Sequence, residues 1–199
     1  FTNGRTERAQ QQISTAYLLI GLVSVLLMAV GLIAAPLLKW NVLLNIQEEV
    51  VSPAVLALSV RNVFVGVTIH FFLKLISSVI YALQKSALNH LLSLSGSILR
   101  LAFVLLAPSK DAEANLLMLS QAYVFLACLP YLAATVAVFA TKLREVRPRV
   151  SCFRWGAVRE IAGVGGIFFV CQLLYMLLVN TNDFCITYFT DPANTTEYN

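Results

Sequence analysis

The sequence predicts an all-α protein, a polytopic bundle of five transmembrane helices. The chain has 199 residues, of which 59% are hydrophobic and only 12% are charged, about half the charged share that soluble domains use. The apolar residues gather in five runs, each with about the 20 residues that one helix needs to cross the hydrocarbon layer. Short polar segments separate these runs, and the basic residues concentrate in alternate segments.

The first two spans are predicted at residues about 15–38 and about 54–83. Lys39 and Trp40 close the first span at an interface, where Trp prefers to lie. The second span carries Arg61 and Lys74 and ends at the polar residues 84–86. Along the first span, residues at helix spacing predict a packing seam: Tyr17, Gly21, Ser24, Met28, Gly31 and Ala35.

The remaining spans are predicted at about 87–107, 114–141 and 160–182. The third span carries Arg100. The fourth contains Pro130, which should kink the helix because it removes one backbone hydrogen bond.

The polar segments fall into two sets on opposite sides of the membrane. One set comprises residues 1–12, 84–86 and 142–159, and the other comprises residues 39–53, 108–113 and those after 182. The first set holds nine Lys and Arg residues and the second holds two. Because basic residues are retained in cytoplasmic loops, the first set is predicted to face the cytoplasm.

Three cations lie inside the predicted spans, at Arg61, Lys74 and Arg100. Each costs roughly 2.5–3.5 kcal/mol to insert, so each needs a partner or a wet cavity. Since no Asp or Glu lies deep in a span, the three cations predict a cavity that receives an anionic ligand. Two alternatives stay open: Arg61 snorkels to the outer interface, and the two deeper cations bond to a helix outside this chain.

Polar residues share faces on the same spans. In the second span, His70, Lys74 and Tyr81 fall on one stripe at about 100° per residue. In the last span, Gln172 lies on a polar face. We therefore include His70, Tyr81 and Gln172 among the candidate substrate-binding residues, although His70 also suits a packing role. In the third span, Ser93, Gly96 and Ser97 share a face with Arg100 and leave room for a helix or a ligand.

The residue pattern argues against an enzyme. The sequence has no paired carboxylates in a cleft and no Ser/His/Asp set, and its four cysteines form no C-x-x-C or other metal-ligand spacing. We expect no catalytic residues, metal, cofactor or nucleic-acid partner. The chain starts at Phe1 and ends at Asn199 after a turn signal, so we expect a fragment of a longer protein.

Several stretches resemble one family of membrane proteins. Residues 78–85 (Ser-Val-Ile-Tyr-Ala-Leu-Gln-Lys), 89–92 (Asn-His-Leu-Leu) and 97–100 (Ser-Ile-Leu-Arg) resemble the fourth and fifth helices of Wzx-type polysaccharide, or O-antigen, flippases. Residues 14–17 and 38–41 are similar to the ends of that family's third helix. Residues 166–172, 182–183 and 195–199 look like its seventh helix and the start of the next. These flippases belong to the multidrug/oligosaccharidyl-lipid/polysaccharide exporter superfamily.

The resemblance implies five spans of a larger two-lobed transporter with 12–14 helices. Residues 1–141 would belong to the N-terminal lobe, 142–159 would form a basic cytoplasmic linker, and 160–199 would hold the first helix of the C-terminal lobe and an outer loop. The linker's Phe153 and Trp155 interleave with arginines, as in a helix lying on anionic lipid, although an ordinary basic loop is the alternative.

The implied activity is transport of an undecaprenyl-pyrophosphate-linked oligosaccharide across the bacterial inner membrane by alternating access. Partners would be this substrate, membrane lipids and a coupling ion, either a proton or sodium. One alternative is a drug/cation antiporter of the same fold, which would favour acidic residues in the cavity. Another is a membrane polysaccharide polymerase or glycosyltransferase, which would need a large polar outer loop.

Overall fold

The computed structural model describes residues 2–44, 51–106 and 111–189, and these ranges contain helices and no strand, which confirms the all-α prediction. Two compact units divide the chain, residues 1–153 and 154–199, and each is described by itself. The α-helices are α1 (Thr2–Ala34), α2 (Trp40–Leu43), α3 (Pro53–Leu73), α4 (Leu75–Ala82), α5 (Ser86–Leu106), α6 (Ala112–Ala140) and α7 (Trp155–Phe189). Two short 3₁₀ helices are η1 (Ala35–Leu37) and η2 (Val150–Cys152).

Five helical segments are long and apolar enough to cross a membrane, as predicted. They are Thr6–Leu37, Pro53–Ala82, Ser86–Leu106, Ala112–Ala140 and Trp155–Leu178. Their outward side chains are mostly large and apolar, including Leu26, Val30 and Phe125. Lipid-facing helices need such a surface because hydrocarbon offers no partner to polar groups. The chain is therefore a multi-pass membrane protein.

Two helices extend beyond their predicted spans. α1 begins at Thr2, well before residue 15, and α7 covers Trp155–Phe189 where 160–182 was expected. Hydropathy locates the segment that crosses lipid, whereas helical hydrogen bonding continues into polar residues on either side. Pro130 lies buried inside α6, which continues through it. Lys110 and residues 190–199, which include most of the expected outer loop, lie outside the described residues.

The predicted span at about 54–83 matches the membrane-crossing segment Pro53–Ala82, but its regular helical hydrogen bonding is interrupted at Lys74, whose backbone stays in the αR region (φ −62°, ψ −13°). α3 ends at Leu73 and α4 begins at Leu75, with Lys74 in a turn between them. The Lys74 amide donates to the His70 carbonyl (2.8 Å), and the Ser77 amide donates to the Lys74 carbonyl (2.9 Å). The second bond spans three residues, so the backbone tightens locally into a 3₁₀-type turn.

The predicted polar break at residues 84–86 is a sharp turn between α4 and α5. Gln84 has a positive φ of 56°, and the Lys85 amide donates to the Ile80 carbonyl (3.1 Å). This is the left-handed C-cap that usually carries glycine. The turn reverses the chain, and α5 runs back along α6.

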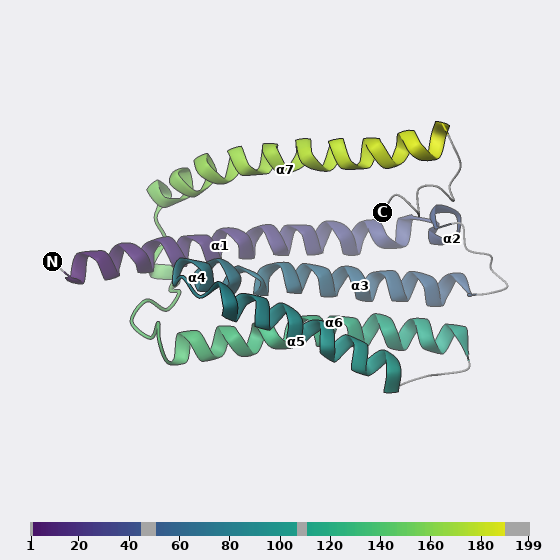
Figure 1. Cartoon of the computed structure of the whole chain (residues 1–199), viewed down its shortest axis with the longest axis horizontal. Coiled ribbons are helices and arrows are strands. Elements are labelled where there is room, and N and C mark those ends of the chain that lie inside the picture. The colour runs from purple at the N-terminus through teal and green to yellow at the C-terminus, as the bar shows by residue number, and fades with distance from the viewer. Residues whose placement is uncertain (1, 45–50, 107–110, 190–199) are drawn as a thin grey trace. The chain divides into compact units, whose positions relative to one another are not determined.

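In the first unit, the long helices run alternately in opposite directions (Figure 1). The start of α1, the α4–α5 turn and the segment after α6 lie at one end, whereas α2 and the starts of α3 and α6 lie at the other. Two hydrogen bonds fasten the first of these ends. Gln10 donates to the Arg147 carbonyl (3.1 Å), and the Arg149 amide donates to the Ser14 hydroxyl (3.0 Å). The fold thus gathers basic residues of three separate segments at one end.

Lys85 and Lys142 meet at this basic end. A side-chain hydrogen bond with Lys142, followed by the repulsion of its charge, lowers the pKa of Lys85. In the linker, residues 142–154 contain a single helical turn, Val150–Cys152, whereas residues 155–159, which carry part of the aromatic and basic pattern, form the start of α7. Contact of the linker with lipid stays a prediction. The segment is a basic connection that hydrogen bonds tie to α1.

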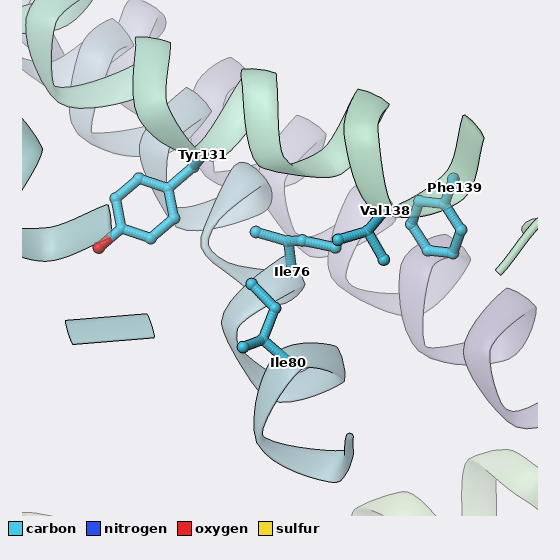
Figure 2. Packing of buried hydrophobic residues seen from close by; sticks show 5 residues of the cluster. All are labelled: Ile76, Ile80, Tyr131, Val138 and Phe139. Atoms are coloured by element: carbon cyan, nitrogen blue, oxygen red, sulfur yellow. The ribbon is translucent and has the colours of Figure 1, made fainter. Parts of the chain in front are cut away.

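The apolar core of the first unit lies where α4 packs on α6. Figure 2 shows Ile76 and Ile80 facing Val138 and Phe139, and both isoleucines are fully buried. Glycines bring the other helices close: a Cβ at Gly31 would collide with Phe64, and one at Gly66 would collide with Val124. Small residues at such contacts are typical of membrane helices. The contact of Gly31 on Phe64 places α1 against α3, as the predicted seam requires.

Candidate functional site

A polar cavity of about 230 Å³ opens between α3, α5 and α6. It contains three of the predicted site residues, His70, Lys74 and Arg100, which come from two different spans. The full lining is Gly66, Val67, His70, Lys74, Ser93, Gly96, Arg100, Tyr123, Ala127 and Tyr131. The two glycines, on α3 and α5, bring these helices close to α6: a Cβ at Gly66 would collide with Val124, and one at Gly96 would lie 3.8 Å from Pro130.

Arg100 is anchored from both sides. Its Nε donates to the Gly96 carbonyl (3.1 Å), and one Nη donates to the Ser97 hydroxyl (3.2 Å). The other Nη donates to the Tyr123 hydroxyl (3.2 Å), and the guanidinium carbon lies 5.2 Å from the centroid of that ring. These partners are neutral. They orient the guanidinium and leave its positive charge available to an anion.

Lys74 reaches the cavity from the turn between α3 and α4. The side chain is exposed, although its backbone lies within a membrane-spanning segment. Helix breaks at membrane depth are tolerated where they line a cavity, because water or a ligand can then reach the polar groups. The interruption between α3 and α4 and the charge of Lys74 therefore lie at the same place, beside the cavity.

His70 both packs and lines the cavity. Its Nδ1 lies 3.1 Å from the Ala127 carbonyl, and its ring meets the Tyr131 ring edge to face at 4.9 Å. If the Nδ1 carries the proton, it donates to this carbonyl and the Nε2 is left as an acceptor. The packing role that the sequence allowed for His70 is confirmed, and the same side chain borders the cavity.

The tyrosines Tyr123 and Tyr131 were missed by the sequence reasoning. Together with Ala127 they lie four residues apart along α6, so all three share one face of the helix. This spacing is visible in the sequence. In the sequence alone the partner helix is unknown, so this spacing looks like that of any amphipathic helix face that packs on a neighbour.

No carboxylate lines the cavity among the residues that the structure describes. Asp111 caps the start of α6, where its side chain accepts a bond from the Ala114 amide (3.0 Å). Glu113 accepts from the Ser52 amide at the same end of the bundle. Glu145 lies in the basic connection that follows α6. The acids that the structure describes in the first unit, which also include Glu7 near the start of α1, thus keep to its ends, as the sequence predicts.

Three predicted site residues are not among the residues that line the cavity. Arg61 is exposed on α3, and Tyr81 is exposed on α4. Tyr81 was placed on the Lys74 stripe by helix periodicity, but Lys74 lines the cavity and Tyr81 does not. Gln172 lies on α7 in the second unit, so its role remains a prediction.

Comparison with known proteins yields no match: no family model, no curated protein and no solved structure is similar to this chain. The site must therefore be interpreted from its own chemistry. Two cations, a histidine, a serine and two tyrosines surround a small space within a membrane bundle. This arrangement can bind an anion through charge-assisted hydrogen bonds.

Proposed function

We propose that the chain is part of a transporter that moves an anionic, lipid-linked oligosaccharide across the bacterial cytoplasmic membrane. The expected substrate is an undecaprenyl-pyrophosphate-linked glycan, as in the Wzx-type flippases that the sequence resembles. The observation that carries the proposal is the cavity shared by Lys74 and Arg100, to which the described residues contribute no acid.

The chemistry of the cavity suits a pyrophosphate. The planar guanidinium of Arg100 matches two phosphate oxygens at once, and its bonds to neutral groups hold it in place. The Lys74 ammonium is a mobile point charge with three donors. Ser93 and Tyr123 add hydroxyl groups for the remaining oxygens. Each interaction is stronger inside a protein than in bulk water, because the effective dielectric constant is lower there.

In the proposed mechanism, the charged head group crosses the bilayer through this polar space while the two lobes alternate their access. Lys74, at the α3–α4 junction, lines this space and would meet the head group on its way. Residues 142–159 would link this lobe to the next, with α7 as the first helix of that lobe. A cation antiporter needs acidic groups to hold its ligand, and the described lining has none, so anion transport is the better account.

Export of surface polysaccharide tests the proposal. In cells that depend on this protein for export, Lys74→Ala and Arg100→Ala should each abolish surface polysaccharide, because a buried anion would lose a charged partner. Lys39→Ala removes a cation next to α2 that is not in the cavity lining. Cells with this variant should export polysaccharide normally. Immunoblots of membrane fractions verify insertion of each variant. Normal export by both cavity variants would refute the proposal.

A further inference from the structure

A second, apolar space lies beside the cationic cavity. It is a groove of about 630 Å³ between α3 and α6, and Leu44, after α2, contributes to its lining. Its lining is Leu44, Leu56, Ser59, Val60, Val63, Phe64, Val67, Leu116, Leu119, Ser120 and Tyr123. From Leu56 to Val67 the groove follows α3 for about 17 Å at 1.5 Å per residue, about half the thickness of the hydrocarbon layer.

The groove and the cavity share two lining residues, Val67 and Tyr123. Tyr123 is the residue whose hydroxyl accepts a bond from Arg100, and the same side chain lines the groove. Polar and apolar binding surfaces therefore meet at one side chain. Another apolar groove, of about 510 Å³ between α1 and α3, shares no lining residue with the cavity.

We propose that the α3–α6 groove holds the hydrocarbon chain of the same amphiphile whose anionic group occupies the cavity. The inference rests on the proposed function and adds a tail-binding site to it. Continuity decides the occupant: a ligand with a phosphate group next to a long apolar chain fits both surfaces at once. A covering helix or a second copy of the chain would use the groove without any need for the adjoining cations.

Two probes separate the head group from the tail. Farnesyl pyrophosphate carries both, and inorganic pyrophosphate carries only the charge. Titration calorimetry on the purified protein in non-ionic detergent should show farnesyl pyrophosphate binding at least about tenfold more tightly, because its chain adds packing contacts with the apolar wall that inorganic pyrophosphate lacks.

Val63 lines the groove and not the cavity, so Val63→Trp fills the groove without replacing a residue of the cavity lining. This change should remove the tenfold advantage and leave the affinity for inorganic pyrophosphate unchanged, which also verifies folding. Leu119→Trp fills the same groove from α6, and it should likewise remove the advantage and leave the affinity for inorganic pyrophosphate unchanged. The matched control is Val25→Trp, which fills the separate α1–α3 groove and should keep the advantage.

The possible results distinguish the two proposals. If both groove variants keep the advantage of farnesyl pyrophosphate, another helix or a second copy covers the groove and the tail site is refuted. The tail site would also be refuted if Val25→Trp lost the advantage of farnesyl pyrophosphate to the same extent. The same holds if both groove variants lost binding of both farnesyl pyrophosphate and inorganic pyrophosphate. If the unaltered protein binds neither probe, the anionic cavity of the proposed function fails and the tail site falls with it.

Discussion

Arg100→Gln should lower the affinity of the purified protein for inorganic pyrophosphate by about 10- to 100-fold, since a hydrogen bond to a charged group contributes roughly 1.5–3 kcal/mol. Gln retains polar atoms but loses the charge and the two-pronged donor. The anchoring contacts with Gly96, Ser97 and Tyr123 should make the loss large, because the guanidinium needs little reordering when it binds. Titration calorimetry at fixed ionic strength measures the change.

Two further variants define what is lost. Arg100→Lys keeps the charge without the planar fork, so its affinity should lie between those of the unaltered protein and Arg100→Gln. Arg61→Gln removes a cation that the sequence placed in the site but that lies outside the cavity lining, and it should change the affinity by less than about twofold. If Arg61→Gln weakened binding as much as Arg100→Gln, the assignment of the anion to this cavity would be wrong.

Gly66→Ala should destabilise the bundle by about 1–3 kcal/mol, the usual cost of adding volume to a packed contact. A Cβ at this position meets the branched side chain of Val124, so α3 and α6 would have to separate. The same change would disturb the wall of the cavity, to which Gly66 belongs. A lower midpoint of thermal unfolding in detergent would record the loss.

A compensating change tests the cause of that loss. Val124→Ala provides space for the added Cβ at position 66. The double variant Gly66→Ala/Val124→Ala should therefore lose less stability than the two single variants lose together. Gly163→Ala is the matched control, since a Cβ there meets nothing within 4 Å, and its stability should remain equal or rise slightly with helix propensity. If the two alanine changes were equally destabilising, close packing at Gly66 would not be the reason.

The number of membrane-crossing helices could be predicted from the sequence because length and apolarity are local properties. The meeting of Lys74 with Arg100 could also be anticipated, since each lies deep in a span and on a polar face. The break at Lys74 could not. Neither Gly nor Pro marks it, and helix periodicity continues across it.

The partners of Arg100 were equally hidden from the sequence. Tyr123 lies 23 residues away on α6, and only the packing of α5 on α6 brings the two together. Tyr81 illustrates the reverse case: helix periodicity groups it with Lys74, yet only Lys74 lines the cavity, and a role for Tyr81 stays a prediction. Local patterns thus identify which residues are unusual, whereas tertiary packing decides which of them share a cavity.

Water access to the deep cations tests the account most directly. In a variant without native cysteines, Ser93→Cys would place a thiol in the cavity, and Leu94→Cys would place one on an exposed position outside its lining. An anionic, membrane-impermeant methanethiosulfonate should modify Cys at 93 faster than a cationic one, and neither should modify Cys at 94. Arg100→Gln should abolish the preference for the anion. Equal rates at the two positions, or a preference for the cationic reagent at position 93, would contradict a water-filled cationic cavity.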